Sequence, residues 1–470
     1  MKEAMENLEL IKYLKNFYGD AFEQFWLAGA EPKAIRVNTL KGSRAQMEEK
    51  LRNWQVDFRP LSFNKDGLTL NNDHLPLSHT LEFFTGAFQY QGMSSQIPPL
   101  VLQPKPGERV LDMAAAPGSK STQLAALMNN EGMLVVNDAV RSRLQSLNAN
   151  LQKAGALNHI ITYLPAERFG NLFPNYFDKI LLDAPCTALG TLCNSKEVAS
   201  WWSLEKLKKL SLVQNALMIA AYKALKPGGE LVYSTCSIAP EENEMIVQNA
   251  LDKYNLEILP IKNISGIDFL AGLSSYHRQI FHPHMPQTLR VAPHIHQMEG
   301  FYIARLRKTA AHKVKEYQRR PTFRPTLDAH APDLRVKLTE LSEYWGIDQN
   351  IWQNYRFMLT KNRIWMTKRF IDNVMQDGFT SVGLLLAEKK SRVWKLFNQS
   401  VQLLADQIRH RRIRLDREQL QILFKRGTIE NGAQLRGYYI LDWQDMPIAS
   451  LYADEASIRI RLPHSFRLVL

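Results

Sequence analysis

The stretch RVLDMAAAPGSKSTQLAAL (residues 109–127) decides the fold of this 470-residue chain. It begins as a short apolar strand, passes through a turn of small residues and continues as a helix from Lys120. Small side chains in such a turn let the backbone approach a ligand, and the start of the following helix offers free N–H donors. The turn matches neither the phosphate-binding GxxxxGK[ST] loop nor the dinucleotide-binding GxGxxG pattern. A tight strand-to-helix turn without a ligand is the alternative for this segment.

Apolar runs and helical stretches alternate along the chain on both sides of this turn. Buried strands are predicted at residues 110–113, 133–136, 160–161, 180–182 and 230–233, with helices at 120–129, 141–153 and 204–225. Repeated strand–helix units favour a mainly parallel sheet with helices on both faces. In such α/β sheets ligands bind beyond the C-terminal ends of the strands. Polar residues at those ends are therefore the candidate site residues.

Three of the predicted strands end in such residues. The second ends at Asp138, where a carboxylate can accept bonds from ribose hydroxyls, or can cap a helix, or both. The fourth strand ends in Asp183, with Cys186 close behind, and the fifth ends at Cys236. Two thiols at neighbouring strand ends favour nucleophilic chemistry over a purely structural role, because a thiolate is an intrinsically strong nucleophile. The residues alone leave open which of the two cysteines attacks.

The third cysteine, Cys193, follows no strand end, and we expect it to be structural. The chain has only three cysteines, no CxxC motif and no Cys/His spacing typical of a metal site. We therefore expect free thiols and no metal.

Several motifs, taken in order, resemble those of the NOL/NOP/Sun family of RNA cytosine-C5 methyltransferases. The central ones are residues 112–120, Asp183-Ala184-Pro185-Cys186, and Tyr233-Ser234-Thr235-Cys236-Ser237 followed by Glu241-Glu242-Asn243-Glu244. Flanking ones are Arg36-Val37-Asn38-Thr39-Leu40, Tyr90-Gln91 with Ser94-Ser95, Pro293-His294 and Glu299-Gly300-Phe301-Tyr302. The resemblance covers roughly residues 30 to 308. Each motif alone is weak, but the ordered set is specific.

The resemblance implies a role for each candidate. Cys236 is implied as the nucleophile that adds to carbon 6 of cytosine, and Cys186 as the residue that assists product release. Asp183 would hold the N3 and N4 edge of the base and lie near the reacting end of S-adenosylmethionine, with Asp138 at the ribose of that cofactor. The remaining cofactor-binding residues would be Ala114, Ala115, Ala116, Pro117, Gly118, Ser119 and Lys120.

The sequence departs from the family pattern at two places. Pro165-Ala166 stand where the family usually has Asp-Gly with an acid near the adenine, and only Glu167 is close by. Thr187-Ala188 follow Cys186 where the family often has Ser-Gly, and the arginine common a few residues later is absent from Leu192-Cys193-Asn194-Ser195. We expect altered adenine contacts and a different hold on RNA at these positions.

Charge also favours an RNA partner. The formal net charge is +13, and phosphate contacts by Lys and Arg release counterions and drive binding. Residues 305–324 carry eight basic side chains and one acid, which indicates a basic linker. The run Arg409-His410-Arg411-Arg412-Ile413-Arg414 either tracks phosphates or forms a solvated helix face.

Beyond the linker, we expect a tail with a helical stretch up to Arg417 and then strands near 438–441, 448–452 and 458–460. Phe424-Lys425-Arg426-Gly427 and Met446-Pro447-Ile448-Ala449 loosely resemble the PUA-like RNA-binding module of the bacterial RsmF-type group, which acts on small-subunit ribosomal RNA.

The complete prediction is an α/β fold with a Rossmann-like S-adenosylmethionine-dependent methyltransferase sheet and two smaller α+β units. The expected divisions are an N-terminal RNA-binding unit (1–92), the methyltransferase domain (93–308), the basic linker (309–345) and a C-terminal PUA-like unit (346–470). The expected reaction is methylation of 16S ribosomal RNA near the decoding region through a covalent adduct.

Three rival functions remain at this stage. One is the same reaction on transfer RNA or another ribosomal site, and another is an RNA-binding assembly factor without catalysis. A DNA methyltransferase, the third, would attack through Cys186 instead.

Location and assembly complete the expectations. No apolar run approaches the roughly 18 to 20 residues of a membrane helix. The start Met1-Lys2-Glu3-Ala4-Met5-Glu6 lacks the pattern of a signal peptide. We therefore expect a cytoplasmic monomer with an RNA or small-subunit partner and no membrane partner.

Overall fold

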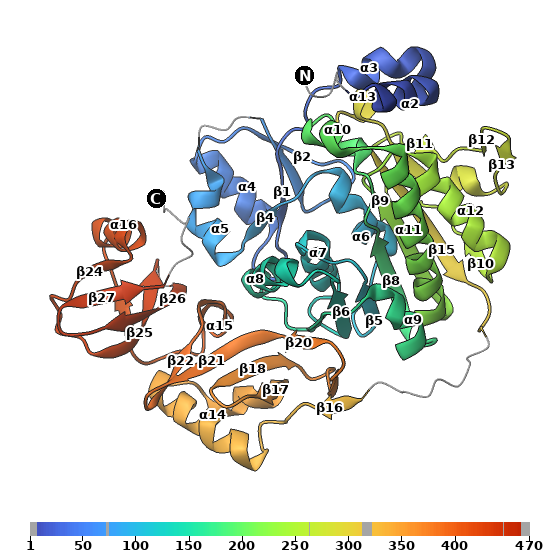
Figure 1. The fold of residues 1–470 in the computed structure, drawn as a ribbon. Helices are drawn as coiled ribbons and strands as arrows, with labels where there is room; N and C mark the ends of the chain where they lie inside the picture. Colours follow the sequence, from blue (N-terminus) through green and yellow to red (C-terminus); the bar gives the residue numbers. More distant parts are fainter. Residues whose placement is uncertain (1–6, 72–74, 263, 313–321, 445, 462–470) are drawn as a thin grey trace.

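A ten-stranded sheet forms the centre of the molecule, with strand order β11-β14-β15-β9-β8-β5-β6-β7-β20 and β10 beside β15. Figure 1 shows several of its strands, among them β15, β9, β8 and β5. The computed structural model describes residues 7–71, 75–262, 264–312, 322–444 and 446–461. The five parallel strands are β5 (Arg109–Asp112), β6 (Met133–Asn137), β7 (His159–Thr162), β8 (Phe177–Asp183) and β9 (Leu225–Thr235). The antiparallel strands are β10 (Leu256–Ile258), β11 (Leu270–Ala271), β14 (Leu289–Val291), β15 (Phe301–Lys308) and β20 (Phe379–Val382).

Helices cover both faces of this sheet, and each face has its own apolar core. One core contains side chains from α6 (Ile97–Leu102), α7 (Ser119–Leu127) and α8 (Leu144–Ala154). The other contains side chains from α9 (Phe169–Leu172), α11 (Leu204–Ala224) and α12 (Glu244–Lys253). Successive strand residues alternate between the two cores because strand side chains point to opposite faces. The predicted Rossmann-like methyltransferase fold is confirmed, and the expected strands and helices lie within a few residues of their predicted bounds.

The N-terminal part divides into two pieces that pack in different places. Strands β1 (Ala34–Val37), β2 (Phe58–Pro60), β3 (Gly67–Leu70) and β4 (Phe88–Tyr90) form a separate four-stranded sheet with α4 (Arg44–Asn53). Helices α2 (Leu8–Tyr18) and α3 (Phe22–Trp26) instead share an apolar cluster with α10 (Glu197–Trp201) and Ile238. The first piece is the small α+β unit that we expected. The second packs against Ile238, two residues after Cys236.

Two further sheets follow the central one. The first contains β17 (Tyr355–Leu359), β18 (Arg363–Lys368), β21 (Leu384–Lys390) and β22 (Val393–Leu396), packed with α14 (Pro332–Trp345) and α15 (Asn398–Leu403). The second contains β23 (Arg412–Arg414), β24 (Thr428–Glu430), β25 (Gly437–Trp443), β26 (Met446–Ala453) and β27 (Ser457–Ile460), packed with α16 (Arg417–Arg426). The predicted strand-rich end is confirmed. The predicted helical stretch up to Arg417 is wrong, because strands dominate residues 355–396.

Much of the expected linker (309–345) is folded rather than extended. The β16 strand (Phe323–Pro325) pairs with β19 (Asn373–Met375), and α14 buries Leu334, Leu338, Leu341 and Trp345. Residues 332–345 therefore belong with the first C-terminal sheet. In the expected basic run, Arg305 pairs with Glu230 at 2.9 Å, and Lys313, Lys315, Arg319 and Arg320 lie outside the described residues, as do Met1–Glu6 at the N-terminus.

The arginine run at residues 409–414 is not a helix face, so that alternative is wrong. Arg412 and Arg414 lie in β23, and Arg412 pairs with the nearly buried Asp442 at 2.6 Å. Arg411 lies over the rings of Tyr344 and Tyr439 and donates to the Tyr438 carbonyl at 2.9 Å. Arg411 thus bridges the two C-terminal units, and Arg412 stabilises the second sheet internally.

The first C-terminal unit joins the catalytic sheet directly through β20, which pairs antiparallel with β7 (Figure 1). The Thr367 hydroxyl donates to the Leu157 carbonyl at 2.6 Å, and the Tyr163 N–H donates to the Gly378 carbonyl at 2.7 Å. β7 is consequently an internal strand. In the described parts of the chain, no helix combines the length and the apolar character needed for a bilayer crossing.

Candidate active site

The two cysteines at the strand ends lie in contact. Cys186 follows β8 and Cys236 follows β9, and these parallel neighbours pair Asp183 with Ser234 at their ends. The Sγ atoms of Cys186 and Cys236 are 3.3 Å apart, and both side chains are partly exposed. The Gly190 N–H donates to the Cys236 carbonyl at 2.9 Å, which fixes the loop after Cys186 against the nucleophile candidate. The pair can therefore act on one substrate atom or on each other.

Asp183 is held beside this pair by two donors. Its Oδ2 accepts from Lys120 Nζ at 2.7 Å, and its Oδ1 accepts from the Ser234 hydroxyl at 2.7 Å. Burial lowers the pKa of Lys120, but attraction to Asp183, Cys236 and Asp112 outweighs burial and raises it above its ordinary value. Lys120 thus stays charged in the site, where it contacts the candidate carboxylate Asp183 as well as belonging to the expected cofactor loop.

The loop at residues 114–120 connects β5 to α7 and is tied to the end of β6. Asp138, only 2% exposed, accepts from the Ala116 N–H at 3.1 Å and from the Val140 N–H at 2.9 Å. Arg143 pairs with Asp138 at 3.5 Å and also donates to the Ala116 carbonyl. Asp138 therefore organises the loop and does not cap a helix itself, because the short 3-10 turn begins after Val140.

Gly118 starts the helix at the end of this loop. Its φ of +105° lies in the left-handed region, and a Cβ at this position would come within 2.9 Å of Leu147 Cδ1. Only glycine combines that conformation with the close approach of α8.

The residues around this loop fit a polar, positively charged cofactor. Asp112 at the end of β5 is 1% exposed, and its Oδ1 has no hydrogen-bond partner among the described residues, whereas its Oδ2 accepts from Ser121 at 2.7 Å. Burial raises the pKa of Asp112 to about 7. Small residues, the N-terminus of a nine-residue helix and nearby carboxylates are the donor and acceptor set that S-adenosylmethionine requires.

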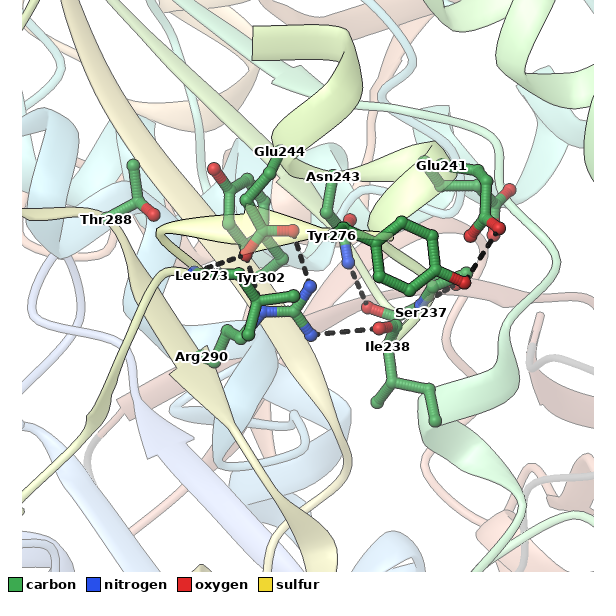
Figure 2. Close-up of polar contacts among 12 residues, drawn as sticks. Ser237, Ile238, Glu241, Asn243, Glu244, Leu273, Tyr276, Thr288, Arg290 and Tyr302 are labelled. Atoms are coloured by element: carbon green, nitrogen blue, oxygen red, sulfur yellow. Dashed lines mark hydrogen bonds and ion pairs between the residues drawn. The ribbon is translucent and has the colours of Figure 1, made fainter. Parts of the chain in front are cut away.

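A buried polar network holds the segment after Cys236. Figure 2 shows Arg290 paired with Glu244 and donating to the Ile238 carbonyl. Arg290 Nε lies 2.6 Å from Glu244 Oε1, and Nη1 lies 2.9 Å from the Ile238 oxygen. Asn243 donates to the Ser237 carbonyl at 3.0 Å. Glu244 is fully buried, and the paired guanidinium compensates its charge. This network fixes the backbone directly behind the nucleophile candidate.

The neighbouring Glu241 serves a different contact in the same view. Its carboxylate accepts from the Tyr276 hydroxyl at 3.1 Å (Figure 2). It also accepts from the hydroxyl of Tyr13 in α2 at 2.7 Å. Glu241 thereby ties the N-terminal helices to the catalytic domain.

Cys193 lies apart from the two other thiols. Its Sγ is 3.9 Å from the Gly190 carbonyl, and burial together with the charges of Glu299 and Glu31 raises its pKa to about 11. Glu31 itself accepts from the backbone N–H groups of Met93 and Glu299, and burial raises its pKa to about 7. Glu31 therefore connects Met93 with Glu299 next to the loop that carries Cys193.

The two departures from the family pattern have different structural settings. Pro165-Ala166 directly follow Leu164, against which Gly378 of the C-terminal unit packs, and Glu167 is exposed. Thr187 is fully buried and donates through its N–H to Glu242 at 2.9 Å. The threonine thus has a structural contact of its own in the loop of Cys186.

The structure brings the predicted site residues to one edge of the sheet: Cys186, Cys236 and Asp183 at the ends of β8 and β9, and residues 114–120 with Asp138 at the ends of β5 and β6. Sequence reasoning did not identify Arg143 or Glu242 as site residues. Glu242 stands in a quoted motif, but its contact with Thr187 joins segments far apart in the chain. Arg143 carries no signal besides its position after Asp138.

Comparisons with known proteins place this arrangement among RNA-modifying enzymes. A family model described as 16S rRNA methyltransferase RsmB/F matches residues 99–307. Ribosomal RNA small subunit methyltransferase F from Aeromonas hydrophila is 36% identical over 378 residues, covering 78% of this chain and 76% of the relative. The tRNA (cytosine(49)-C(5))-methyltransferase of Pyrococcus abyssi is 39% identical and covers 62% of this chain and 93% of its own.

A third relative is much longer than the shared region. The 26S rRNA (cytosine-C(5))-methyltransferase nsun-1 of Caenorhabditis elegans is 36% identical, and the chain spans 43% of its length.

Solved structures agree in fold. A methyltransferase homologue from Pyrococcus horikoshii superposes with a TM-score of 0.58 at 35% identity, covering 66% of this chain and 99% of the other. NSun6 from the same organism, solved with SFG, gives a TM-score of 0.56 at 26% identity. The match covers 64% of this chain and 98% of the NSun6 chain.

Proposed function

The chain belongs to the RsmB/F family of RNA cytosine-C5 methyltransferases, and on that basis we propose that it methylates carbon 5 of a cytosine in small-subunit ribosomal RNA. The observation that carries the proposal is the contact of Cys186 and Cys236, 3.3 Å apart beside the Lys120–Asp183 pair. Two adjoining thiols next to a carboxylate are what an adduct-forming and adduct-releasing reaction on a pyrimidine needs.

The first step activates the base. Carbon 5 of cytosine is a poor nucleophile, and addition of the Cys236 thiolate to carbon 6 moves the electron pair of the C5–C6 double bond toward carbon 5. Asp183, fixed by Lys120 and Ser234, would accept from the N4 amino group of the ring, and from N3 once N3 is protonated. The charged Lys120 favours the anionic species that form beside it.

The second step transfers the methyl group. When bound, S-adenosylmethionine would supply an electrophilic methyl group for carbon 5, and the electron pair of the methyl–sulfur bond would remain on its sulfur as a neutral thioether. Residues 114–120 would wrap the cofactor, Asp138 would face its ribose and Asp183 its reacting end. A relative solved with SFG, an analogue of this cofactor, supports the assignment.

The third step releases the product. The proton on carbon 5 passes to water, its electron pair restores the C5–C6 double bond, and the bond between carbon 6 and Cys236 Sγ breaks. Cys186, in contact with that sulfur, donates its S–H to the departing thiolate. Without this donor the adduct should persist.

Ribosomal RNA is favoured as substrate by the extent of the similarity. Three small-subunit relatives match 78% to 82% of this chain, whereas a fourth matches 59% and the archaeal tRNA relative 62%. The C-terminal sheets are thus shared more with these three ribosomal enzymes, and we assign residues 346–470, together with α14, to a PUA-like RNA-binding unit. Residues 1–92 would supply a second RNA contact to the 93–308 domain.

Base access is a further requirement of this substrate. A cytosine stacked inside folded RNA cannot expose carbon 6, so the base must leave the stack while basic flanking units hold the backbone. A site near the decoding region and action as a cytoplasmic monomer complete the proposal. A non-catalytic assembly factor is disfavoured, because both thiols and the Lys120–Asp183 pair are in place.

The test measures methyl transfer from labelled S-adenosylmethionine to purified small ribosomal subunits, naked 16S RNA and total transfer RNA. Incorporation into small subunits, mapped to one cytosine by bisulfite sequencing, is expected. Incorporation only into transfer RNA would replace the substrate, and none into any RNA, with RNA binding intact, would overturn the enzymatic proposal.

A further inference from the structure

Glu242 is a buried carboxylate that contacts the loops of both catalytic thiols. It lies in the 3-10 turn Pro240–Glu242 and is 0% exposed. Its Oε1 accepts from the Thr187 N–H and from Gln214 Nε2, both at 2.9 Å, and its Oε2 accepts from the Thr187 hydroxyl. Burial raises the pKa of Glu242 above its ordinary value, and the hydrogen bonds that its carboxylate accepts oppose this by stabilising the ionised form.

These contacts tie the two cysteine-bearing loops together. Thr187 directly follows Cys186, and Ser237 directly follows Cys236. The hydroxyls of Thr187 and Ser237 are 3.3 Å apart, directly beside the Glu242 carboxylate. Loss of Glu242 would therefore remove part of the link between the two loops and leave the bond from the Gly190 N–H to the Cys236 carbonyl.

The charges around the thiol pair are distributed unequally. Glu242 acts on Cys186: the hydrogen bond with Cys236, burial, and the charges of Cys236 and Glu242 together raise the pKa of Cys186 well above its ordinary value. The Lys120 ammonium group, in contrast, interacts electrostatically with Cys236. The Glu242 carboxylate therefore acts on Cys186, whereas the Lys120–Asp183 ion pair lies beside Cys236.

The remaining titratable groups near Glu242 do not cancel this asymmetry. Asp183 is neutralised by Lys120 at 2.7 Å. Tyr233 donates its hydroxyl to the Glu242 backbone carbonyl, and burial raises its pKa well above the ordinary value, so it stays neutral.

We propose that Glu242 is a positioning residue that holds Cys186 against Cys236 and keeps the proton of the thiol pair on Cys186. The inference rests on the proposed methyl-transfer function for its purpose, but not for its test. It explains how two thiols in contact take different roles: Cys236 becomes the thiolate that attacks, and Cys186 keeps the S–H that assists release.

The test compares the reactivity of the two thiols in the full-length protein. Iodoacetamide reacts with thiolates, and peptide mass spectrometry separates modification at Cys186 from that at Cys236 across pH 6 to 9. The Glu242→Gln variant keeps the shape and an acceptor for Thr187 but removes the charge. Since one pKa unit corresponds to a tenfold change in thiolate fraction, we expect Cys186 to react roughly three- to tenfold faster in this variant.

Matched variants separate charge from packing. Glu241→Gln removes the adjacent carboxylate, which contacts Tyr13 and Tyr276 and neither thiol loop, so both thiols should react as in the wild type. Glu242→Asp keeps the charge and should restore the wild-type order of reactivity. A melting temperature measured on each variant shows that it is folded.

Two outcomes would overturn the inference. One is a folded Glu242→Gln variant with an unchanged reactivity ratio. The other is available from the wild type even if that variant does not fold: Cys186 reacting as fast as Cys236, or faster. Absence of methyl transfer with the thiol asymmetry intact would contradict the proposed function and leave this inference standing.

Discussion

Cys186 and Cys236 differ in their neighbours more than in their positions. Both follow parallel strands, and this placement, with Asp183, could be predicted because polar residues after buried strands gather at one sheet edge. The Lys120–Asp183 contact at 2.7 Å could not, since it depends on how α7 lies over β5 and β8. The link from Glu242 to Thr187 was equally inaccessible, because it joins two loops by side chains alone.

Asp112 gives the residue-scale prediction. Burial raises its pKa from 3.8 to about 7, so the folded protein keeps a proton there that the unfolded chain loses near pH 4. This stabilising contribution is complete below pH 4 and is lost as the pH rises to 7. Asp112→Asn removes the titration, so its free energy of unfolding should improve relative to the wild type by on the order of 2 kcal/mol between pH 4 and 7. Urea unfolding of both proteins without cofactor measures this, and parallel pH profiles would contradict the assignment.

At the scale of elements, the parallel strands were predictable and β20 was not. The strands β5 to β9 carry apolar runs that indicate two-sided burial, and each was located. The β20 strand is short and mixed in character, and its partner β7 lies far away in the chain. The helical stretch that we predicted before Arg417 was wrong for a similar reason. The half-buried strands of the first C-terminal sheet are too short for their hydrophobic periodicity to distinguish a strand from a helix.

Gly378 tests the join between β20 and β7. Its φ is +67°, and a Cβ there would meet Leu164 Cγ at 2.5 Å and the Tyr163 carbonyl at 2.7 Å. Gly378→Ala should therefore destabilise the protein by about 2 to 4 kcal/mol through overpacking and backbone strain. Gly432→Ala is the control, because nothing lies within 4 Å of its Cβ position. Chemical denaturation of both variants gives the comparison, and equal stability would show that the contact with β7 is not formed.

For the whole molecule, the C-terminal part is a structural partner of the catalytic sheet. Ile160 of β7 shares an apolar cluster with Met358, Ile371, Val374 and Val382. The sequence indicated a tail joined by a basic linker, and charge alone could not reveal that the tail folds back onto the sheet edge. The catalytic sheet and the C-terminal unit, to which we assign RNA binding, therefore share an apolar cluster.

Truncation tests this integration. A chain ending at residue 312 lacks β20 and exposes the β7 edge and Ile160, so we expect aggregation or a clearly lower melting temperature. A chain ending at residue 411 loses the second C-terminal sheet but keeps β20, so the β7 edge should stay covered and the melting temperature should fall less. Size-exclusion chromatography and thermal melts distinguish the two, and a short form as soluble and stable as the full chain would refute the shared core.

The central claim, attack by Cys236 and release by Cys186, is tested most directly by trapping the covalent adduct. Cys186→Ala, Cys236→Ala and Cys193→Ala are each incubated with small-subunit RNA and S-adenosylmethionine, then run on a denaturing gel. We predict a slowly migrating protein–RNA band for Cys186→Ala, none for Cys236→Ala, and unchanged methyl transfer without a band for the Cys193→Ala control. A band from Cys236→Ala and none from Cys186→Ala would contradict the account and assign the attack to Cys186.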